Sequence, residues 1–334
     1  MRTGVLLNAE CGDEPASQAY DRLLCHVRAI EDNGFDTIWI PQAHACASEP
    51  MPSPLVMAGA IAAETRAIRI GVFVKLALEH PVKICEDVAV LDLLCHGRLL
   101  FGADPGGREQ EYAGARVGWA PRLEALREAL EIVVRGWTSD GFAYLGEFYR
   151  LPRNTRAPAS AGRYQAEPCV PPHRAPTERA GLPFDYLSIL PKPLQIPHPP
   201  VYLVAADRET ADLAARRGHS LLIPPQVESA AEVADHYWRV LEGAGRHRHE
   251  IDLAIARDVY VEIDGEQARK RVTVKTAGSL IGSPDEVLHG IKDLQHVTGL
   301  RHLLCRMQLP GLTTGQTDAS IRLFAAEVRS RLQM

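Results

Sequence analysis

The sequence lacks the features that mark membrane, nucleic-acid-binding and secreted proteins. No apolar run approaches the roughly 20 residues of a membrane-spanning helix. The first apolar run is too short for a signal peptide and turns acidic at once. The 37 Lys and Arg are outnumbered by 42 Asp and Glu, with a net charge of -5 and a pI of ≈ 6.2, whereas nucleic-acid surfaces are normally basic. We expect a cytoplasmic protein that binds neither nucleic acid nor membrane.

The chain also lacks the cysteine spacing of a disulfide framework or a zinc site. The number of cysteines is odd, none forms a CxxC pair, and most fall on apolar faces, which favours buried thiols. His44 and Cys46 supply only two ligands, so we expect no metal site. The seven cysteines are Cys11, Cys25, Cys46, Cys85, Cys95, Cys169 and Cys305.

Short apolar strands alternate with helical patterns along almost the whole chain. Eight strands that alternate with eight helices predict a parallel sheet, and its natural closure is a single α/β domain over residues 1–334, a (β/α)8 TIM barrel. An open doubly wound sheet is the alternative. Ser53-Pro54 and Ser283-Pro284 are typical helix starts, and Gly34 and Gly218 are typical stops. The predicted strands are Gly4–Asn8, Phe35–Ile40, Ile68–Val74, Arg98–Gly102, Val201–Ala205, Ser220–Ile223, Leu253–Glu262 and Arg301–Arg306. The predicted helices are Ser17–Asn33, Ser53–Thr65, Pro81–Cys95, Pro121–Trp137, Glu209–Arg217, Ala230–Leu241, Pro284–Val297 and Asp318–Leu332.

One segment, Leu151–Pro183, interrupts this alternation before the fifth predicted strand. It holds seven prolines and five arginines against two glutamates and has no apolar period. Such a stretch cannot form a core element. We expect a lid over the active-site face, a surface that recruits an acidic carrier protein, or a disordered loop without a role.

The segment His80–Gly107, HPVKICEDVAVLDLLCHGRLLFGADPGG, predicts a helix, a tight turn and a strand that ends in a glycine-rich loop. It resembles a signature of the bacterial-luciferase-like monooxygenases, in which a histidine-proline pair opens a helix and "leucine-aspartate-x-leucine-serine-x-glycine-arginine" closes it. Leu91, Asp92, Leu94, Gly97 and Arg98 match, and Cys95 stands where serine is usual. The approach to the fifth strand, the start of the penultimate helix and the end of the last strand also resemble the family: residues 191–200, 280–287 and 306–311.

The resemblance implies a site at the carboxyl ends of the strands, where barrels of this kind carry reacting groups. The family usually has glutamate-histidine-histidine after strand two, and here the triplet is Gln42-Ala43-His44. An imidazole has an unperturbed pKa of about 6.5 and can both take and give a proton, so His44 is the first candidate for proton transfer, with Gln42 beside it. Glu111 matches a family carboxylate, and an ion pair with Arg108 or Arg116 is the structural alternative.

The implied flavin-binding groups follow strands three, four and five. Lys75 either meets an anionic flavin or acidic substrate, or pairs with Asp104. At the phosphate end Pro105 replaces a common arginine and Asp207 a common serine, while Pro224 replaces a frequent hydroxyl. The phosphate is then bound by other groups, of which Arg208 is the nearest, or is not bound. The predicted cofactor-binding residues are Lys75, Leu76, Asp104, Gly106, Ala206, Arg208 and Thr210.

Three functions remain open. The first is an oxidoreductase, an FMN-dependent monooxygenase that acts on a small organic substrate, with secondary metabolism as one expected setting. A flavin reductase would then be a partner, and a homodimer would be compatible. The second is a deazaflavin-dependent oxidoreductase that transfers hydride. The third is a barrel without a cofactor, which serves as a binding protein or as a catalyst that relies on His44.

Overall fold

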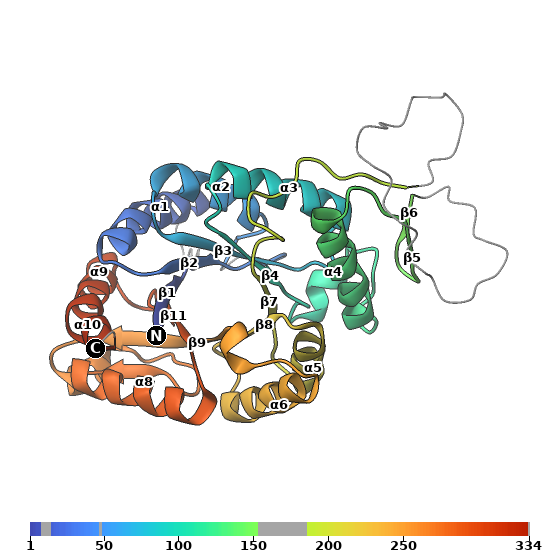
Figure 1. Ribbon diagram of the computed structural model, residues 1–334. Coiled ribbons are helices and arrows are strands. Elements are labelled where there is room, and N and C mark those ends of the chain that lie inside the picture. The colour runs from blue at the N-terminus through green and yellow to red at the C-terminus, as the bar shows by residue number, and fades with distance from the viewer. Residues whose placement is uncertain (8–14, 47–48, 153–185, 333–334) are drawn as a thin grey trace. The chain divides into compact units, whose positions relative to one another are not determined.

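The computed structural model describes residues 1–7, 15–46, 49–152 and 186–332 (Figure 1). The chain divides into two compact units. The first comprises Met1–Val74, Arg98–Asp104 and Pro200–Met334, and the second comprises Lys75–Gly97 and Pro105–Pro199. Of the predicted insertion, residues 153–183 lie outside the described residues. The expectation of one domain over residues 1–334 stays a prediction.

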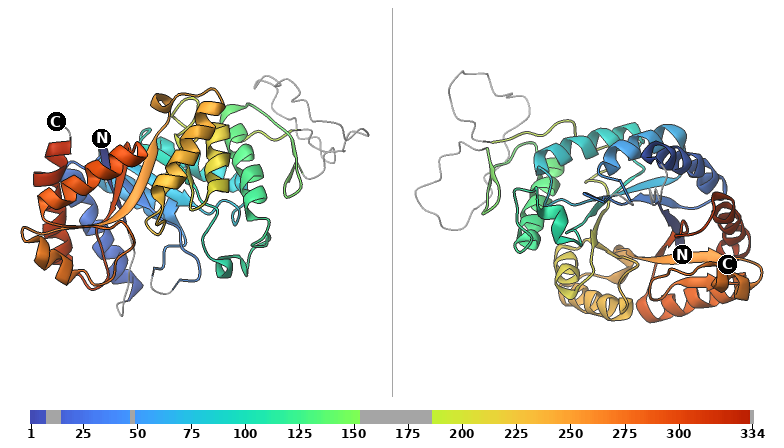
Figure 2. Two further views of the ribbon diagram at one scale, coloured as in Figure 1. Left: turned by 90° about the horizontal axis from the view of Figure 1, so that it is seen from below. Right: turned by 180° about the vertical axis from the view of Figure 1, so that it is seen from behind.

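The first unit contains a closed parallel barrel. Each barrel strand pairs in parallel with its two neighbours in chain order. The ring closes because β9 (Leu253–Val261) pairs with both β8 (Ser220–Ile223) and β11 (His302–Arg306). The predicted (β/α)8 barrel is therefore confirmed, and helices of this unit lie outside its strands (Figure 2). The eight strands are β1 (Arg2–Leu6), β2 (Thr37–Ile40), β3 (Arg69–Val74), β4 (Leu99–Ala103), β7 (Val201–Val204), β8 (Ser220–Ile223), β9 (Leu253–Val261) and β11 (His302–Arg306).

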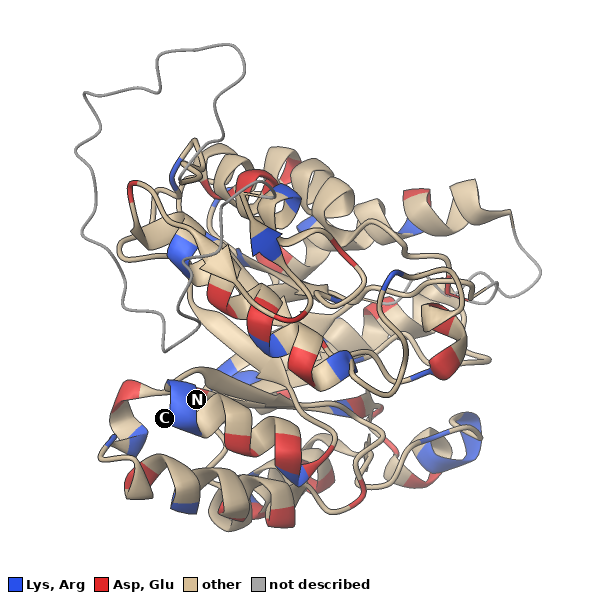
Figure 3. Cartoon of the chain, turned by 90° about the vertical axis from the view of Figure 1, so that its right-hand side faces the viewer, with Lys and Arg blue, Asp and Glu red and all other residues tan. Residues whose placement is uncertain are grey.

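The helices follow the strands in the expected order, with ends that shift by a few residues. Both serine-proline pairs start a helix as predicted. Ser283 caps its helix through a reciprocal pair of bonds with Glu286, whereas Ser53 stands at the N-cap position but its side chain makes no cap bond. Acidic and basic residues are interspersed along the helices (Figure 3). The first unit holds α1 (Ala16–Asp32), α2 (Pro54–Glu64), α5 (Arg208–Arg217), α6 (Ala230–Gly243), η2 (Arg248–Glu250), α7 (Gly265–Arg271), α8 (Pro284–Thr298), α9 (Thr314–Leu323), the π-helical η3 (Phe324–Arg329) and α10 (Ser330–Leu332).

The barrel interior is packed with side chains. The Trp39 ring stacks on Phe73, with 4.8 Å between ring centroids, and meets Tyr202 edge-on at 5.0 Å. Glycines on the neighbouring strands make room: a Cβ at Gly71 would lie 2.1 Å from the Trp39 ring, and one at Gly102 would lie 2.4 Å from Phe73. This aromatic layer fills the middle of the barrel, so a ligand has access only beyond it, at the carboxyl ends of the strands.

Below the aromatic layer, at the amino ends of the strands, lies a buried polar network. The Asp252 carboxylate accepts a 2.6 Å hydrogen bond from the Tyr202 hydroxyl and forms an ion pair with Arg2 at 2.5 Å. The Nδ1 atom of His302 lies 3.5 Å from the same carboxylate. The other ring nitrogen of His302 is 2.8 Å from Thr37 Oγ1. Polar residues at this end of a barrel serve stability.

The second unit is built on two helices, α3 (Pro81–Leu94) and α4 (Arg122–Thr138), with a 3-10 turn, η1 (Glu109–Tyr112). The buried Cys85 thiol lies against carbonyls of α4, and the Trp137 indole donates to the Cys85 carbonyl. A hairpin of β5 (Tyr144–Leu145) and β6 (Arg150–Leu151) belongs to this unit and was not predicted. Two elements of the first unit were not predicted either. These are β10 (Leu280–Gly282), which extends the sheet beside β9, and the helix α7.

Candidate active site

The loop after β2 holds two of the predicted residues. Backbone pairing of Ala43 with Met51 turns the chain back on itself, and the Gln42 side-chain amide donates to the Pro52 carbonyl at 3.0 Å. His44 is half-buried. Its neighbour Ala45 has a φ of 49°, a left-handed value that residues other than glycine seldom adopt. Gln42 thus fixes the loop, and strain at Ala45 sets the backbone next to His44.

The start of α5 is already occupied by a carboxylate of the chain itself. Asp207 is the N-cap residue, and its Oδ1 accepts a 2.8 Å hydrogen bond from the backbone N–H of Thr210. Arg208 is exposed and lies 3.3 Å from Glu232 of α6. Ala206 is exposed, whereas Thr210 is buried. The helix start therefore presents a negative charge where the family resemblance implies the flavin phosphate.

The end of β11 and the part of β9 that faces it carry a polar cluster that sequence reasoning missed in part. Asp258 and Arg306 are register partners, and Arg306 Nε donates to Asp258 Oδ1 at 2.6 Å. The other oxygen of Asp258 accepts two bonds from Thr276, from the backbone N–H and from the hydroxyl, both at 2.9 Å. Burial raises the pKa of Asp258, but the bonds from Arg306 and Thr276 outweigh it and hold that pKa below its usual range. The signal in the sequence was the pair Arg257-Asp258, two adjacent charges within an otherwise apolar strand.

Asp104 follows β4 and continues its ladder, because its backbone N–H donates to the Val74 carbonyl. Its side chain is half-buried.

In the second unit, Lys75 and Glu111 form a buried ion pair. Glu111 also accepts from Arg108 at 2.9 Å, so the predicted pairing with Arg108 is confirmed. The Glu111 and Lys75 side chains are 1% and 6% exposed, and Leu76 is fully buried. Gly106 has a φ of 77°, and a Cβ there would meet the Tyr112 ring at 3.2 Å, so this turn requires glycine. The Tyr112 hydroxyl closes the turn by donating to the Pro105 carbonyl.

Comparison with known proteins identifies the family. The sequence model of the luciferase-like monooxygenases matches residues 1–296. This chain belongs to that family. The oxygenase component of a flavin-dependent trigonelline monooxygenase from Acinetobacter baylyi is 24% identical over 231 residues, which cover 67% of this chain and 54% of that protein. The chain spans about half the length of the first curated relatives that it matches, 54%, 46% and 56%.

Solved structures share the luciferase-like fold. A monooxygenase from Streptomyces bottropensis aligns with a TM-score of 0.80 at 20% identity and covers 99% of this chain and 100% of its own. The oxygenating constituent of 3,6-diketocamphane monooxygenase from Pseudomonas putida, solved in complex with FMN, aligns with a TM-score of 0.77 at 17% identity over 99% and 98% of the two chains. Other matched proteins are named as F420-dependent enzymes.

The luciferase-like signature residues of this chain hold backbone in place. The guanidinium of Arg98 donates to carbonyls of Ala62, Thr65 and Ile68 and so fixes the end of α2. Within the second unit, the fully buried Asp92 accepts from the backbone and side chain of Gln195 at 2.9 and 2.8 Å. The motif that reveals the luciferase-like family therefore has a structural role here.

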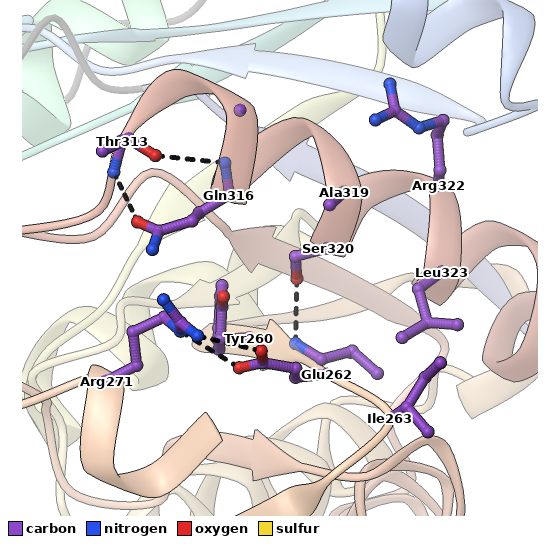
Figure 4. A pocket seen from close by; sticks show the side chains of 12 residues that line it. Tyr260, Glu262, Ile263, Arg271, Thr313, Gln316, Ala319, Ser320, Arg322 and Leu323 are labelled. Carbon is purple, nitrogen blue, oxygen red and sulfur yellow. Dashed lines mark hydrogen bonds and ion pairs between the residues drawn. The ribbon is translucent and has the colours of Figure 1, made fainter. Parts of the chain in front are cut away.

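A groove of about 670 Å³ lies in the first unit between the end of β9 and α9 (Figure 4). Its polar groups already bind one another: Arg271 binds Glu262 through two 3.1 Å bonds, the Ser320 hydroxyl accepts from Val261, and Thr313 and Gln316 cap α9 reciprocally. A polar ligand would have to break these pairs, so we assign no site here.

Within the described ranges, no three His, Cys, Asp or Glu side chains are grouped so as to hold a metal ion. Among the helices described, none has the length and apolar character needed to cross a membrane.

Proposed function

We propose that this chain is a monooxygenase that uses reduced FMN, delivered by a separate reductase, to oxygenate a small organic substrate. Membership of the luciferase-like family supports the class, and the trigonelline relative is named as an oxygenase component. A reduced flavin supplies the electrons for such a reaction, while the protein supplies binding, orientation and exclusion of water.

The proposal that the flavin binds weakly and exchanges rests on the Asp207 cap of α5. The family resemblance places the flavin phosphate at this helix start, where N–H groups and the helix dipole favour an anion. Here Asp207 takes the Thr210 N–H and adds a negative charge, so the residues do not fit a phosphate in that position. A lost charge-assisted contact weakens binding by roughly ten- to a hundred-fold, which suits a flavin that arrives, reacts and leaves.

The proposed role of this chain's own residues begins with the barrel. The aromatic layer under the mouth excludes water from below. Gln42 fixes the loop that carries His44, and His44 gives or takes a proton at the substrate. In the second unit, Lys75 with Glu111 is a fixed buried ion pair, and we propose that Lys75 with Leu76 and Gly106 borders the flavin.

The experiment is a titration of the purified protein with oxidised and with reduced FMN, followed by oxygen uptake with a nicotinamide-driven flavin reductase. We expect saturable, weak binding of FMN and a purified protein without bound flavin. Flavin that survives gel filtration at one per chain would contradict weak binding, and a titration without any signal would contradict the flavin.

A second candidate is hydride transfer with the deazaflavin F420. The same departures from the family's phosphate site favour it, because F420 carries a different tail beyond the ring system, and matched proteins include F420-dependent enzymes. Titration with F420 under the same conditions separates the two. Binding of neither cofactor would favour the third function, a barrel without a cofactor.

A further inference from the structure

Arg306 is the last residue of β11 and lies at the carboxyl end of the barrel. His302, Leu304 and Arg306 alternate along this strand on the face that looks into the barrel, with His302 in the polar network and Leu304 in the core. The Arg306 side chain is 24% exposed, while Asp258 beside it is fully buried. The guanidinium therefore stands at the open end of the interior.

Asp258 fixes this guanidinium through a single nitrogen. Its Oδ1 accepts from Arg306 Nε, and its Oδ2 is saturated by the two bonds from Thr276. A guanidinium has five N–H donors, and four of them belong to the terminal nitrogens. Within the part of the chain that the structure describes, neither terminal nitrogen of Arg306 bonds to the protein.

Several other arginines in the described ranges differ in this respect, although the exposed Arg248 also binds only through its Nε. Both terminal nitrogens of Arg98 donate to backbone carbonyls, and one of them also donates to a hydroxyl. Arg239 donates to the carboxylate of Asp235 from Nε and from one terminal nitrogen. When a guanidinium is fixed through Nε, its two terminal nitrogens can donate two parallel hydrogen bonds. This arrangement matches the paired oxygens of a carboxylate or phosphate.

The charge at this strand end also favours an anion. Arg257 precedes Asp258, is 3% exposed, and donates only to the Ala256 carbonyl among the described residues. Asp258 binds Arg306 directly and acts on Arg257 only through a Coulomb interaction without contact, so the Arg257 charge is buried without an ion-pair partner among the described residues, and uncompensated buried charge is costly. β9 and β11 are the seventh and eighth strands of the barrel, after which barrels of this fold frequently bind phosphate.

We propose that Arg306 forms an oxyanion subsite in the barrel mouth, with Asp258 as its positioning residue. The subsite binds a carboxylate of the substrate or the phosphate of the flavin through the terminal N–H groups of Arg306. Only the source of the oxyanion rests on the proposed function, because the subsite itself needs no flavin.

The test uses the full chain without flavin and two simple probes, benzoate and inorganic phosphate, in calorimetric titrations. We expect at least one probe to bind, and Arg306→Gln to weaken it at least about tenfold. Arg306→Lys keeps the charge but loses the fork, so it should restore only part of the affinity. Arg239→Gln, which removes a surface arginine, is the matched control and should change nothing. Equal affinity in Arg306→Gln and the wild type, or no binding of either probe, overturns the proposal.

Titrations with FMN and with riboflavin, which lacks the phosphate, identify the source of the oxyanion. If the preference for FMN disappears in Arg306→Gln, the subsite binds the flavin phosphate. If FMN binds unchanged while benzoate weakens, it binds a substrate carboxylate. Asp258→Asn should weaken the probes as well, with Arg306 still present, and a thermal melt confirms that each variant is folded. Benzoate binding in a protein that binds no flavin would leave the subsite standing and refute the proposed function.

Discussion

The carboxylate of Asp207 accepts a 2.8 Å hydrogen bond from the backbone N–H of Thr210, at the start of α5. One side chain therefore stabilises the helix and excludes an anion from its N-terminus. Asn in place of Asp keeps the accepting oxygen and removes the charge. We predict that Asp207→Asn tightens FMN binding by roughly two- to fivefold, since a single charge at a helix terminus is worth about 0.3–1 kcal/mol. Fluorescence titration with FMN measures this.

Riboflavin, which has no phosphate, is the control ligand and should bind Asp207→Asn as it binds the wild type. Asp207→Ala separates stability from charge, because it loses the cap and should lower the free energy of unfolding by about 1 kcal/mol. If Asp207→Asn binds both flavins as the wild type does, the phosphate does not lie at α5.

The ion pair of Lys75 with Glu111 yields a prediction about stability. Removal of one partner leaves a buried charge, so Glu111→Leu should lower the free energy of unfolding by about 3–5 kcal/mol. Lys75→Met should lower it somewhat less, because Arg108 remains near Glu111. The double variant Lys75→Met with Glu111→Leu should recover most of this loss. Denaturant unfolding of the three variants forms a double-mutant cycle. Additive losses would show that the two side chains do not interact.

The barrel was predictable because its strands are apolar, short and separated by capped helices. Gly218 ends α5 with a φ of 71°, and Ser283 starts α8, so both ends could be placed from single residues. The helix α7 was missed because it buries only Gly265 and Ala268 among seven residues, which gives no apolar period. The three-residue β10 is too short to produce a pattern.

The candidate site was less predictable, because its contacts join residues that are far apart in the sequence. Asp258 meets Arg306 only through the register of β9 against β11, and Thr276 reaches Asp258 from a loop. Sequence spacing offered Arg108 as a partner of Glu111, three residues away, but gave no sign of Lys75 at a separation of 36. His44 was proposed as a site residue only because it follows the end of β2, and its role stays a prediction.

The network around Asp252 predicts how stability depends on pH. Burial alone would raise the pKa of Asp252, but hydrogen bonds and charges from His302, Arg2 and Tyr202 lower it from 3.8 to about 2. A carboxyl group with a depressed pKa contributes stability above its unfolded pKa and loses it as pH falls through the folded value. We therefore expect about 2 kcal/mol of unfolding free energy to be lost between about pH 4 and pH 2. Asp252→Asn should remove this part of the pH dependence in denaturant melts. Asp235→Asn, in an exposed pair, should keep it.

His44 yields the last prediction, which concerns turnover. If His44 transfers a proton at the substrate, His44→Gln should lower kcat by about 10²- to 10⁴-fold, while the melting temperature changes little because the side chain is only half-buried. Steady-state oxygen uptake and product formation with a reductase measure the first effect, and a thermal melt measures the second. Ala45→Gly is the matched control in the same loop: it relieves the left-handed φ of 49°, should raise stability by about 1 kcal/mol, and should leave kcat near the wild-type value. A drop in kcat in Ala45→Gly as large as in His44→Gln would assign the effect to loop geometry. Full turnover in His44→Gln would remove His44 from the proton transfer.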